Sequence, residues 1–306
     1  MYPYVTVIGG VNLDIKGCPL GQLTAATSNS GKVHTSAGGV GRNIAHNLAL
    51  LGVPVYLLAA VGNDSFGAQI LAETREAGVQ VDYMQVIAGQ QTGIYLAVLD
   101  HVHDLSVAIA DMDVTASINQ DYLEQQRGLI QQSRVVVLET NLSTEALRTA
   151  IKLCRQAQIP YLIEPVSVEK ARKIHAISGN VDTITPNTSE LEALSGRKFA
   201  TMESLPAVCA ELQGRFRHLL VTLGAQGVYH YDASAQCGQH YAAFPTRVLD
   251  ANGAGDAFVA GFVSGIFHEY QIDRCIRLGM AAAHFTLQSI DTVNNELTFE
   301  RCLTLI

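Results

Sequence analysis

The chain has 306 residues, of which 48% are hydrophobic, and carries a formal net charge of −8 from 20 basic and 28 acidic residues. This length allows one large α/β domain or two small ones with a full hydrophobic core. The acidic balance argues against nucleic acid or an anionic membrane surface as the main partner, whereas a small anionic ligand needs only a local positive site.

The first residues resemble a strand and lack the basic segment that opens a signal peptide. No apolar stretch reaches membrane-spanning length without polar breaks, and the six cysteines are dispersed without a Cys-x-x-Cys pair. We therefore expect a cytoplasmic protein with reduced thiols and no membrane partner.

A short apolar strand over 4–8 ends in two glycines and is followed by a segment in which Asn12 and Asp14 alternate with apolar residues. On a strand, two residues that are two positions apart point to one face. This pattern fits either a half-exposed strand with a solvated face or two side chains that hold sugar hydroxyls.

A glycine-rich turn precedes the first predicted helix. Gly39, Gly41 and Asn43 lie just before an apolar helical pattern over 44–51, which Gly52 ends. Glycines in this position permit close approach of the backbone to a ligand. The spacing matches neither a P-loop nor Gly-x-Gly-x-x-Gly.

A strand over 55–61 and a helix ending near 77 form a strand–helix unit of the doubly wound kind. The next segment differs, because 94–98 and 105–109 read as an antiparallel hairpin with a polar tip that includes His103. Together with the polar segment before residue 37, this hairpin predicts a small β appendage, formed from about 12–36 and 92–113, on one α/β body.

The α/β alternation returns after residue 115. We predict helices near 119–132, 143–157 and 168–177, strands over 134–138, 161–163, 182–185 and 217–222, and a closing antiparallel pair over 228–231 and 239–243. Polar residues follow several of these strands, namely Glu139, Glu164, Asn187, Glu190 and Thr222. In an open α/β sheet, ligands bind beyond the carboxyl ends of the strands, so we expect the site there.

The stretch from Asp250 to Phe258 contains two glycines and the acid Asp256 immediately before an apolar helix. Glycine turns at helix N-termini bind anions, because free N–H groups and the positive end of the helix dipole point outward together. Asp256 is then either a proton-accepting base beside a developing phosphate charge or a first-turn acid that the dipole stabilises.

Five motifs stand in order along the chain. They are Gly38-Gly39-Val40-Gly41-Arg42-Asn43, Val61-Gly62-x-Asp64-x-Phe66-Gly67, Asn187-x-x-Glu190, Thr222-Leu223-Gly224-x-x-Gly227 and Asp250-Ala251-Asn252-Gly253-Ala254-Gly255-Asp256. In this order they resemble the motifs of the PfkB (ribokinase-like) family of sugar and nucleoside kinases, over essentially the whole chain.

The resemblance implies a single kinase domain over 1–306, built as a three-layer αβα sandwich with a mostly parallel central sheet and a small β-sheet lid. It implies phosphoryl transfer from ATP to an alcohol, with Asp256 as the general base. The N–H groups of Gly253, Ala254 and Gly255 would form the anion hole. The lid would exclude water and pair two subunits into a homodimer.

The remaining roles also follow from the resemblance. The residues expected to hold the sugar are Asn12, Asp14, Gly39, Gly41, Asn43 and Glu139. Those expected at the nucleotide are Asn187, Thr222, Gly224 and Gly227, with Asn295 as a substitute for an adenine contact that Gly279-Met280 lack. Magnesium would be organised through water by Glu190, and a potassium ion would be held by the carbonyls of Asp250 and Asn252, although Asn252 replaces the usual Thr.

Within this family the chain is similar to bacterial pseudouridine kinases. The similarity covers Ser28 to Val33 with Gly38 to Gly52, Asp111-Met112, Thr140 to Ser143, and Glu164 to Ser167 followed by Lys170. It implies phosphorylation of the pseudouridine 5′-hydroxyl, with base contacts from Thr92, Tyr95, Asp111 and Lys170 or, alternatively, only ordinary surface roles for these side chains. Other nucleoside, ribose or sugar kinases, and a non-catalytic sensor on the same fold, are the alternatives.

Overall fold

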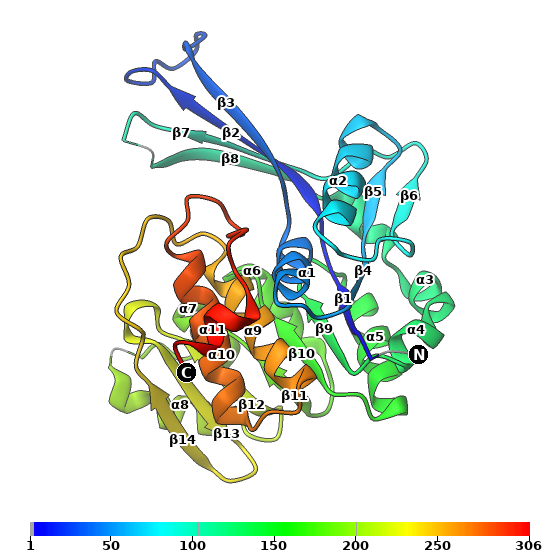
Figure 1. Cartoon of the computed structure of the whole chain (residues 1–306), viewed down its shortest axis with the longest axis vertical. Helices are drawn as coiled ribbons and strands as arrows, with labels where there is room; N and C mark the ends of the chain where they lie inside the picture. Colours follow the sequence, from blue (N-terminus) through cyan, green and yellow to red (C-terminus); the bar gives the residue numbers. More distant parts are fainter. Residues whose placement is uncertain (1–2, 103, 200) are drawn as a thin grey trace.

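The computed structural model describes residues 3–102, 104–199 and 201–306. It has an eight-stranded sheet with helices on both faces, and a four-stranded sheet that projects from one end of this body (Figure 1). The predicted three-layer α/β architecture with a small β-sheet is therefore confirmed. His103 of the predicted hairpin tip lies outside the described residues.

The large sheet has the strand order β14-β13-β12-β11-β10-β9-β1-β4. Its strands are β1 (Val5–Ile8), β4 (Val55–Leu58), β9 (Val135–Glu139), β10 (Tyr161–Glu164), β11 (Val181–Ile184), β12 (Phe216–Thr222), β13 (Val228–Asp232) and β14 (Cys237–Tyr241). From β12 to β4 all neighbours are parallel, and β13 and β14 close the sheet as the predicted antiparallel pair.

Two hydrophobic cores cover the two faces of this sheet. Along β9, Val135 and Val137 enter one core while Val136 and Leu138 enter the other, which explains why the strand reads as a continuous apolar run. The first core is covered by α1 (Val40–Leu50), α9 (Ala254–Phe267), α10 (Ile272–Thr286) and α11 (Phe299–Leu303). The second is covered by α3 (Gln120–Gln125), α4 (Arg127–Gln131), α5 (Thr144–Ala157), α7 (Thr188–Ser195) and α8 (Leu205–Glu211).

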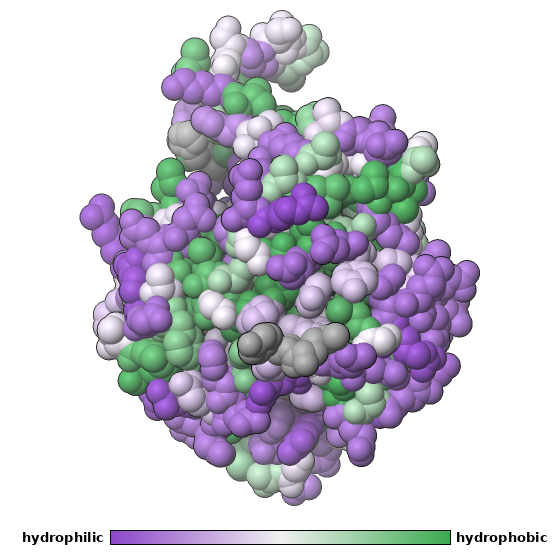
Figure 2. All heavy atoms as spheres, turned by 45° about the vertical axis from the view of Figure 1, so that its right-hand side comes forward, coloured by the Kyte–Doolittle hydropathy of each residue, from purple (hydrophilic) through white to green (hydrophobic). Residues whose placement is uncertain are grey.

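The small sheet has the order β3-β2-β7-β8 and consists of β2 (Asn12–Pro19), β3 (Gly31–Gly38), β7 (Ile94–Leu99) and β8 (Leu105–Asp111). Because residues paired across strands share a face, Asn12, Asp14 and Tyr95 lie on one face, whereas Leu13, Leu96 and Ile109 lie on the other. In Figure 2 this sheet stands above the body, with hydrophobic and hydrophilic atoms both reaching its surface.

Three predicted elements are divided in the structure. The predicted strand over 55–61 is wrong as a single strand, because the chain leaves the large sheet after β4 and β5 (Ala60–Gly62) pairs with β6 (Gln85–Ile87) in a separate sheet. The helix near 119–132 is broken at Gln126, which caps both α3 and α4. The helix near 168–177 consists of α6 (Val168–Ala171) and a 3₁₀ turn, η2 (Arg172–Ala176).

The remaining elements are α2 (Ser65–Glu76) and the 3₁₀ turns η1 (Asp113–Ser117), η3 (Met202–Ser204) and η4 (Gly224–Gln226). Asp64 caps α2 by accepting a hydrogen bond from the backbone N–H of Gly67. Among the described residues, no helix is both long and apolar enough to cross a lipid bilayer.

Candidate active site

The carboxyl ends of four neighbouring parallel strands carry polar side chains in spatial order. Thr222 ends β12, Asn187 follows β11, Glu164 ends β10 and Glu139 ends β9, with Glu164 and Glu139 directly paired. A pocket of about 190 Å³ lies at this edge, and residues that line it include Glu164, Thr185, Asn187, Glu190, Thr222 and Asp256. The sequence-based expectation that the strand ends gather at one place is confirmed.

The turn before α9 forms another wall of this pocket, through Gly253 and Gly255. Gly253 has a φ of 78°, and a Cβ atom there would lie 1.9 Å from the carbonyl oxygen of Thr292. Only glycine fits both the left-handed backbone and this close contact. The helix of 14 residues begins at Ala254, so the unpaired N–H groups of its first turn lie at the pocket.

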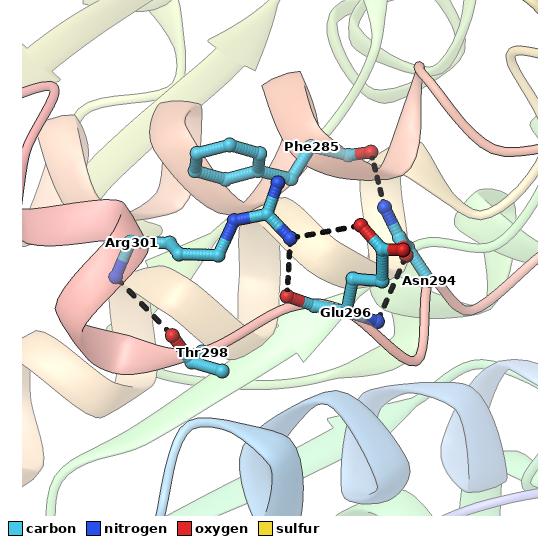
Figure 3. A network of polar contacts seen from close by, with 5 residues as sticks. All are labelled: Phe285, Asn294, Glu296, Thr298 and Arg301. Atoms are coloured by element: carbon cyan, nitrogen blue, oxygen red, sulfur yellow. Dashed lines mark hydrogen bonds and ion pairs between the residues drawn. The ribbon is translucent and has the colours of Figure 1, made fainter.

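The loop after α10 supports this turn from behind, and a polar network shown in Figure 3 closes the loop on itself. Asn294 donates from Nδ2 to the carbonyl oxygen of Phe285 (2.8 Å) and accepts from the backbone N–H of Glu296 (3.0 Å). Arg301 donates to the carbonyl oxygen of Glu296 (2.8 Å) and lies over the Phe285 ring at 4.6 Å. The network thus holds the loop that places Thr292 against the glycine turn.

Asp256 lies in the first turn of α9, and its carboxylate accepts a hydrogen bond from Asn43 Nδ2 (2.9 Å). Burial raises the pKa of Asp256 to about 7; the bond from Asn43 opposes this rise, while the nearby carboxylates of Glu139 and Asp14 add to it. A carboxyl group with a pKa near 7 can both accept and release a proton at neutral pH.

The small sheet contributes Asn12 and Asp14 from β2. Asn12 is buried and donates from Nδ2 to Asp14 Oδ1 (2.6 Å), so the alternative of a merely solvated face is wrong for Asn12. A Cβ atom at Gly38 would lie 2.3 Å from Asp14 Oδ2, so this glycine makes room for the carboxylate. Burial raises the pKa of Asp14, and the bond from Asn12 opposes that rise.

Glu139 is fully buried, and both of its carboxylate oxygens accept hydrogen bonds. Oε1 accepts from the backbone N–H of Gly10 (2.5 Å), and Oε2 accepts from the backbone N–H (2.9 Å) and Nδ2 (2.6 Å) of Asn141. Lys170 on α6 donates to Asn141 Oδ1. Lys170 was predicted as a base contact, whereas in the structure its ammonium group is bonded to this amide.

Asn187 and Glu190 form a capping box at the start of α7, each accepting from the other's backbone N–H at 2.9 Å. Beside them, Glu164 accepts from the hydroxyl of Thr185. Burial raises the pKa of Glu190 and raises that of Glu164 well above its usual range. Glu164 was not among the predicted site residues, although its place at a strand end was the signal for it.

Within the described part of the chain, no three His, Cys, Asp or Glu side chains are grouped to hold a metal ion by themselves. Glu164 and Glu190 nevertheless offer two carboxylates at one pocket, next to the amide oxygen of Asn187. This oxygen set fits magnesium, which usually takes one or two protein carboxylates together with waters and substrate phosphates.

Two predicted base contacts are placed away from the pocket. Thr92 is buried, and its hydroxyl donates to Asp64 (2.7 Å) and accepts from the backbone N–H of Gly62 (3.0 Å). Asp111 pairs with Ile94 and so lies on the face of the small sheet opposite to Asn12 and Asp14. Both predictions are corrected, since one hydroxyl is used by the fold and the other side chain points away from the site.

The predicted nucleotide residues lie at the far end of the pocket from Glu139. Gly224 and Gly227 flank η4, and a Cβ atom at Gly227 would lie 2.0 Å from the carbonyl oxygen of Tyr241, so this glycine also serves packing onto β14. Asn252 donates its backbone N–H to Asp250 Oδ1 (2.9 Å). Asn295 is exposed, next to the Asn294 whose amide the loop network uses.

Exposed apolar side chains that the sequence did not single out flank the same turn. Val248 is 55% exposed, Leu249 54% and Ile290 76%. The backbone N–H of Leu249 donates to the carbonyl oxygen of Leu287 (2.8 Å), which places the two loops side by side. Apolar surface of this kind suits the flat face of a base.

Comparison with known proteins agrees with this geometry. A family model described as pfkB family carbohydrate kinase matches residues 3–298. The pseudouridine kinase of Escherichia coli strain K12 is 36% identical over 304 residues, covering 99% of this chain and 96% of the relative. The uncharacterized sugar kinase YeiI of the same organism is 34% identical over 306 residues (99% and 83%), and the guanosine-inosine kinase of Exiguobacterium acetylicum is 30% identical over 290 residues (94% and 95%).

Solved structures show the same architecture. A carbohydrate kinase from Agrobacterium tumefaciens matches with a TM-score of 0.85 at 27% identity, covering 99% of this chain and 97% of that one. Arabidopsis thaliana ribokinase complexed with ribose and ATP matches with a TM-score of 0.88 at 23% identity, covering 100% and 99%. The chain therefore belongs to the pfkB family of carbohydrate kinases, and it is a phosphotransferase that uses a hydroxyl group as acceptor.

Proposed function

We propose that the protein transfers the γ-phosphoryl group of ATP to the 5′-hydroxyl of pseudouridine. The observation that carries the proposal is the buried carboxyl group of Asp256, bonded to Asn43 and placed at the start of α9. The 36% identity to a pseudouridine kinase over nearly the whole chain supports this acceptor, and relatives named for a sugar and for guanosine and inosine define the alternatives.

In this proposal Asp256 accepts the proton of the acceptor hydroxyl as its oxygen attacks the γ-phosphorus. The N–H groups of Gly253, Ala254 and Gly255, with the positive end of the α9 dipole, stabilise the charge that develops on the transferring group. Positioning and charge stabilisation supply most of the catalysis in phosphoryl transfer, so a rigid turn is well suited to the task.

The substrates would occupy the two ends of the row of strand ends. Asn12, Asp14, Asn43 and Glu139 would hold the ribose, with Gly39 and Gly41 allowing close approach. Thr222, Gly224, Gly227 and Asn295 would hold the nucleotide. Tyr95 shares the face of Asp14 in the small sheet and is the side chain placed to reach the base.

Glu164, Asn187 and Glu190 would hold magnesium through water and the ATP phosphates, where the ion would supply charge neutralisation. The carbonyl oxygens of Asp250 and Asn252 would bind potassium beside the turn, because hard oxygen donors suit an alkali cation. We also propose that the small sheet closes as a lid, that two subunits pair through it, and that the enzyme works in the cytoplasm with its six free cysteines reduced.

A substrate panel tests the acceptor. Purified protein is assayed with ATP and magnesium against pseudouridine, uridine, guanosine, inosine and ribose, and the product is identified by mass spectrometry. We expect the highest kcat/KM for pseudouridine. Efficient phosphorylation of ribose or guanosine without pseudouridine would overturn the acceptor while leaving the kinase assignment intact.

The sensor alternative is separated by the Asp256→Asn variant. If the protein is a kinase, this variant binds pseudouridine in calorimetry but turns it over roughly 10²–10⁴-fold more slowly, the usual contribution of a general base. Equal turnover by the variant and the wild type would remove Asp256 from the mechanism.

A further inference from the structure

A continuous chain of polar contacts joins α6 to the centre of the site. Lys170 donates from Nζ to Asn141 Oδ1, Asn141 donates from Nδ2 to Glu139 Oε2 (2.6 Å), and Glu139 Oε1 accepts from the backbone N–H of Gly10 (2.5 Å). Glu139 is fully buried, and no other side chain is placed so close to both Asn141 and Glu139 by the contacts given for the described residues. The chain therefore links a cation to a buried carboxylate through a single amide.

The amide of Asn141 has a defined sense in this chain. An amide presents an acceptor on one side and donors on the other, so a lysine bonded to the oxygen turns the NH₂ group toward the carboxylate. The reversed amide would set two oxygens against each other at Glu139 and bring an NH₂ group against the ammonium. Lys170 thus fixes the orientation in which Asn141 can hold Glu139.

The electrostatics of Glu139 agree with this arrangement. Burial raises its pKa, while the bonds from Asn141 and Gly10 and the charge of Lys170 lower it. The other charged groups that interact with Glu139 are the carboxylate of Asp256, on α9, and the ammonium of Lys173, in η2. Lys173 donates to the carbonyl oxygens of Thr140 (2.9 Å) and Leu142 (3.0 Å) and not to the carboxylate itself.

We propose that Asn141 is a positioning residue that holds Glu139 ionised and fixed for the acceptor, and that Lys170 acts through Asn141 as the remote counter-charge rather than as a base contact. The proposal rests on the proposed function, in which Glu139 holds the acceptor sugar. An ionised, doubly bonded carboxylate can only accept hydrogen bonds from the acceptor, so it selects hydroxyl donors at that position.

The experiment measures the protonation of Glu139 directly, without turnover. The carboxyl stretch of protonated Glu139 is followed against pH by infrared difference spectroscopy and is assigned with the Glu139→Gln variant. We expect Lys170→Met and Asn141→Leu to move this titration to higher pH, because each removes an interaction that favours the charged form. Lys170→Arg keeps the positive donor and should titrate close to the wild type.

Lys173→Met is the matched control, since it removes a neighbouring ammonium that bonds only backbone carbonyls in the same segment. It should leave the Glu139 titration within a few tenths of a pH unit of wild type. Equal titrations in Lys170→Met and Lys173→Met would overturn the proposal, as would an unshifted titration in Asn141→Leu. Circular dichroism confirms that each variant is folded, and Lys170→Arg carries the test if Lys170→Met does not fold.

Acceptor kinetics supply the second readout. Below neutral pH, Lys170→Met should raise the KM for the acceptor roughly tenfold, the size of one hydrogen bond to a charged group, with a smaller change in kcat. A wild type without activity on any member of the panel would refute the proposed function, yet the infrared titration would still decide the role of Asn141. A shift in KM that is the same at all pH values would contradict control through the charge of Glu139.

Discussion

At the scale of single residues, the environment of Asp256 fixes how the rate should depend on pH. The base must be ionised to accept a proton, and burial raises its pKa to about 7. We therefore expect kcat/KM for the acceptor to rise with pH through about 7 and to level off above it. A pH–rate profile of the wild type checks this, and a flat profile between pH 5 and 8 would contradict a base in this environment.

The same carboxyl group should also cost the fold stability at high pH. The unfolded group titrates near 4 and the folded group near 7, so between these values the folded state binds more protons than the unfolded state. Its contribution to the free energy of unfolding is therefore complete below pH 4 and is lost as the pH rises through 7.

The Asp256→Asn variant removes this ionisation. At pH 8 we expect it to be more stable than the wild type by up to about 4 kcal/mol, from three pKa units at about 1.4 kcal/mol each. At pH 4 the two proteins should differ little. Thermal unfolding at both pH values gives the comparison, and a variant less stable than the wild type at pH 8 would show that the ionised carboxylate is not buried at a cost.

Single residues also show what the sequence could and could not reveal. Asp256 and Asn12 were found because glycine turns and two-residue alternation are local patterns. Thr92 was misassigned because its partner Asp64 lies 28 positions away, and Asp111 because the register that sets its face depends on pairing with β7. Glu164 was visible at a strand end, but only the folded sheet brings it beside Glu190 and Asp256.

At the scale of elements, the turn before α9 depends on one glycine more than on the other. Gly253 has a φ of 78° and no room for a Cβ atom, whereas a Cβ atom at Gly255 would meet nothing within 4 Å. We expect Gly253→Ala to lose roughly 1–3 kcal/mol of stability from backbone strain, together with most of kcat. Gly255→Ala is the matched control and should keep or slightly gain stability, because alanine favours a helix.

Chemical denaturation and steady-state kinetics of both variants test this difference. Comparable stability of the two alanine variants would mean that the contact between Gly253 and Thr292 does not constrain the turn.

The capping box of α7 allows metal binding to be separated from helix stability. Glutamine can replace glutamate as the third residue of such a box, so Glu190→Gln should keep the bond to the backbone of Asn187 while removing a charge from the pocket. We expect a stability within about 1 kcal/mol of wild type and a several-fold higher magnesium concentration for half-maximal rate. Glu190→Ala should lose stability as well.

Magnesium titrations of the rate, with unfolding curves for both variants, give the comparison. An unchanged magnesium requirement in Glu190→Gln would exclude this carboxylate from the metal site.

The elements themselves were predicted where their signals are local. The strands of the large sheet appear as short apolar runs, and α5 and α9 as apolar helical patterns. The strand over 55–61 divides because Ala60–Gly62 finds a partner in Gln85–Ile87, which no local pattern shows. Likewise, both break points at Gln126 and Arg172 fall within sequences that suit a continuous helix.

At the scale of the whole molecule, the small sheet has two unlike faces. The face with Asn12 and Asp14 belongs to the site, while the opposite face carries Leu96, Val107 and Ile109, which are 38%, 54% and 63% exposed. Val33 of β3 and Leu105 of β8, at 67% and 57% exposed, add further apolar surface to this sheet. Contiguous apolar surface on a projecting sheet marks a protein interface.

We therefore expect a homodimer in which the two small sheets pack through these apolar faces, and Ile109→Lys should convert it to a monomer, because an ammonium group would be buried at the contact. Val86→Lys is the matched control: Val86 is 50% exposed but lies on β6, outside the small sheet. Sedimentation at micromolar concentration should show a dimer for the wild type and Val86→Lys and a monomer for Ile109→Lys. If closure depends on pairing, the monomer should also show a raised KM for the acceptor with the KM for ATP unchanged. A dimeric Ile109→Lys would place the interface elsewhere on the molecule.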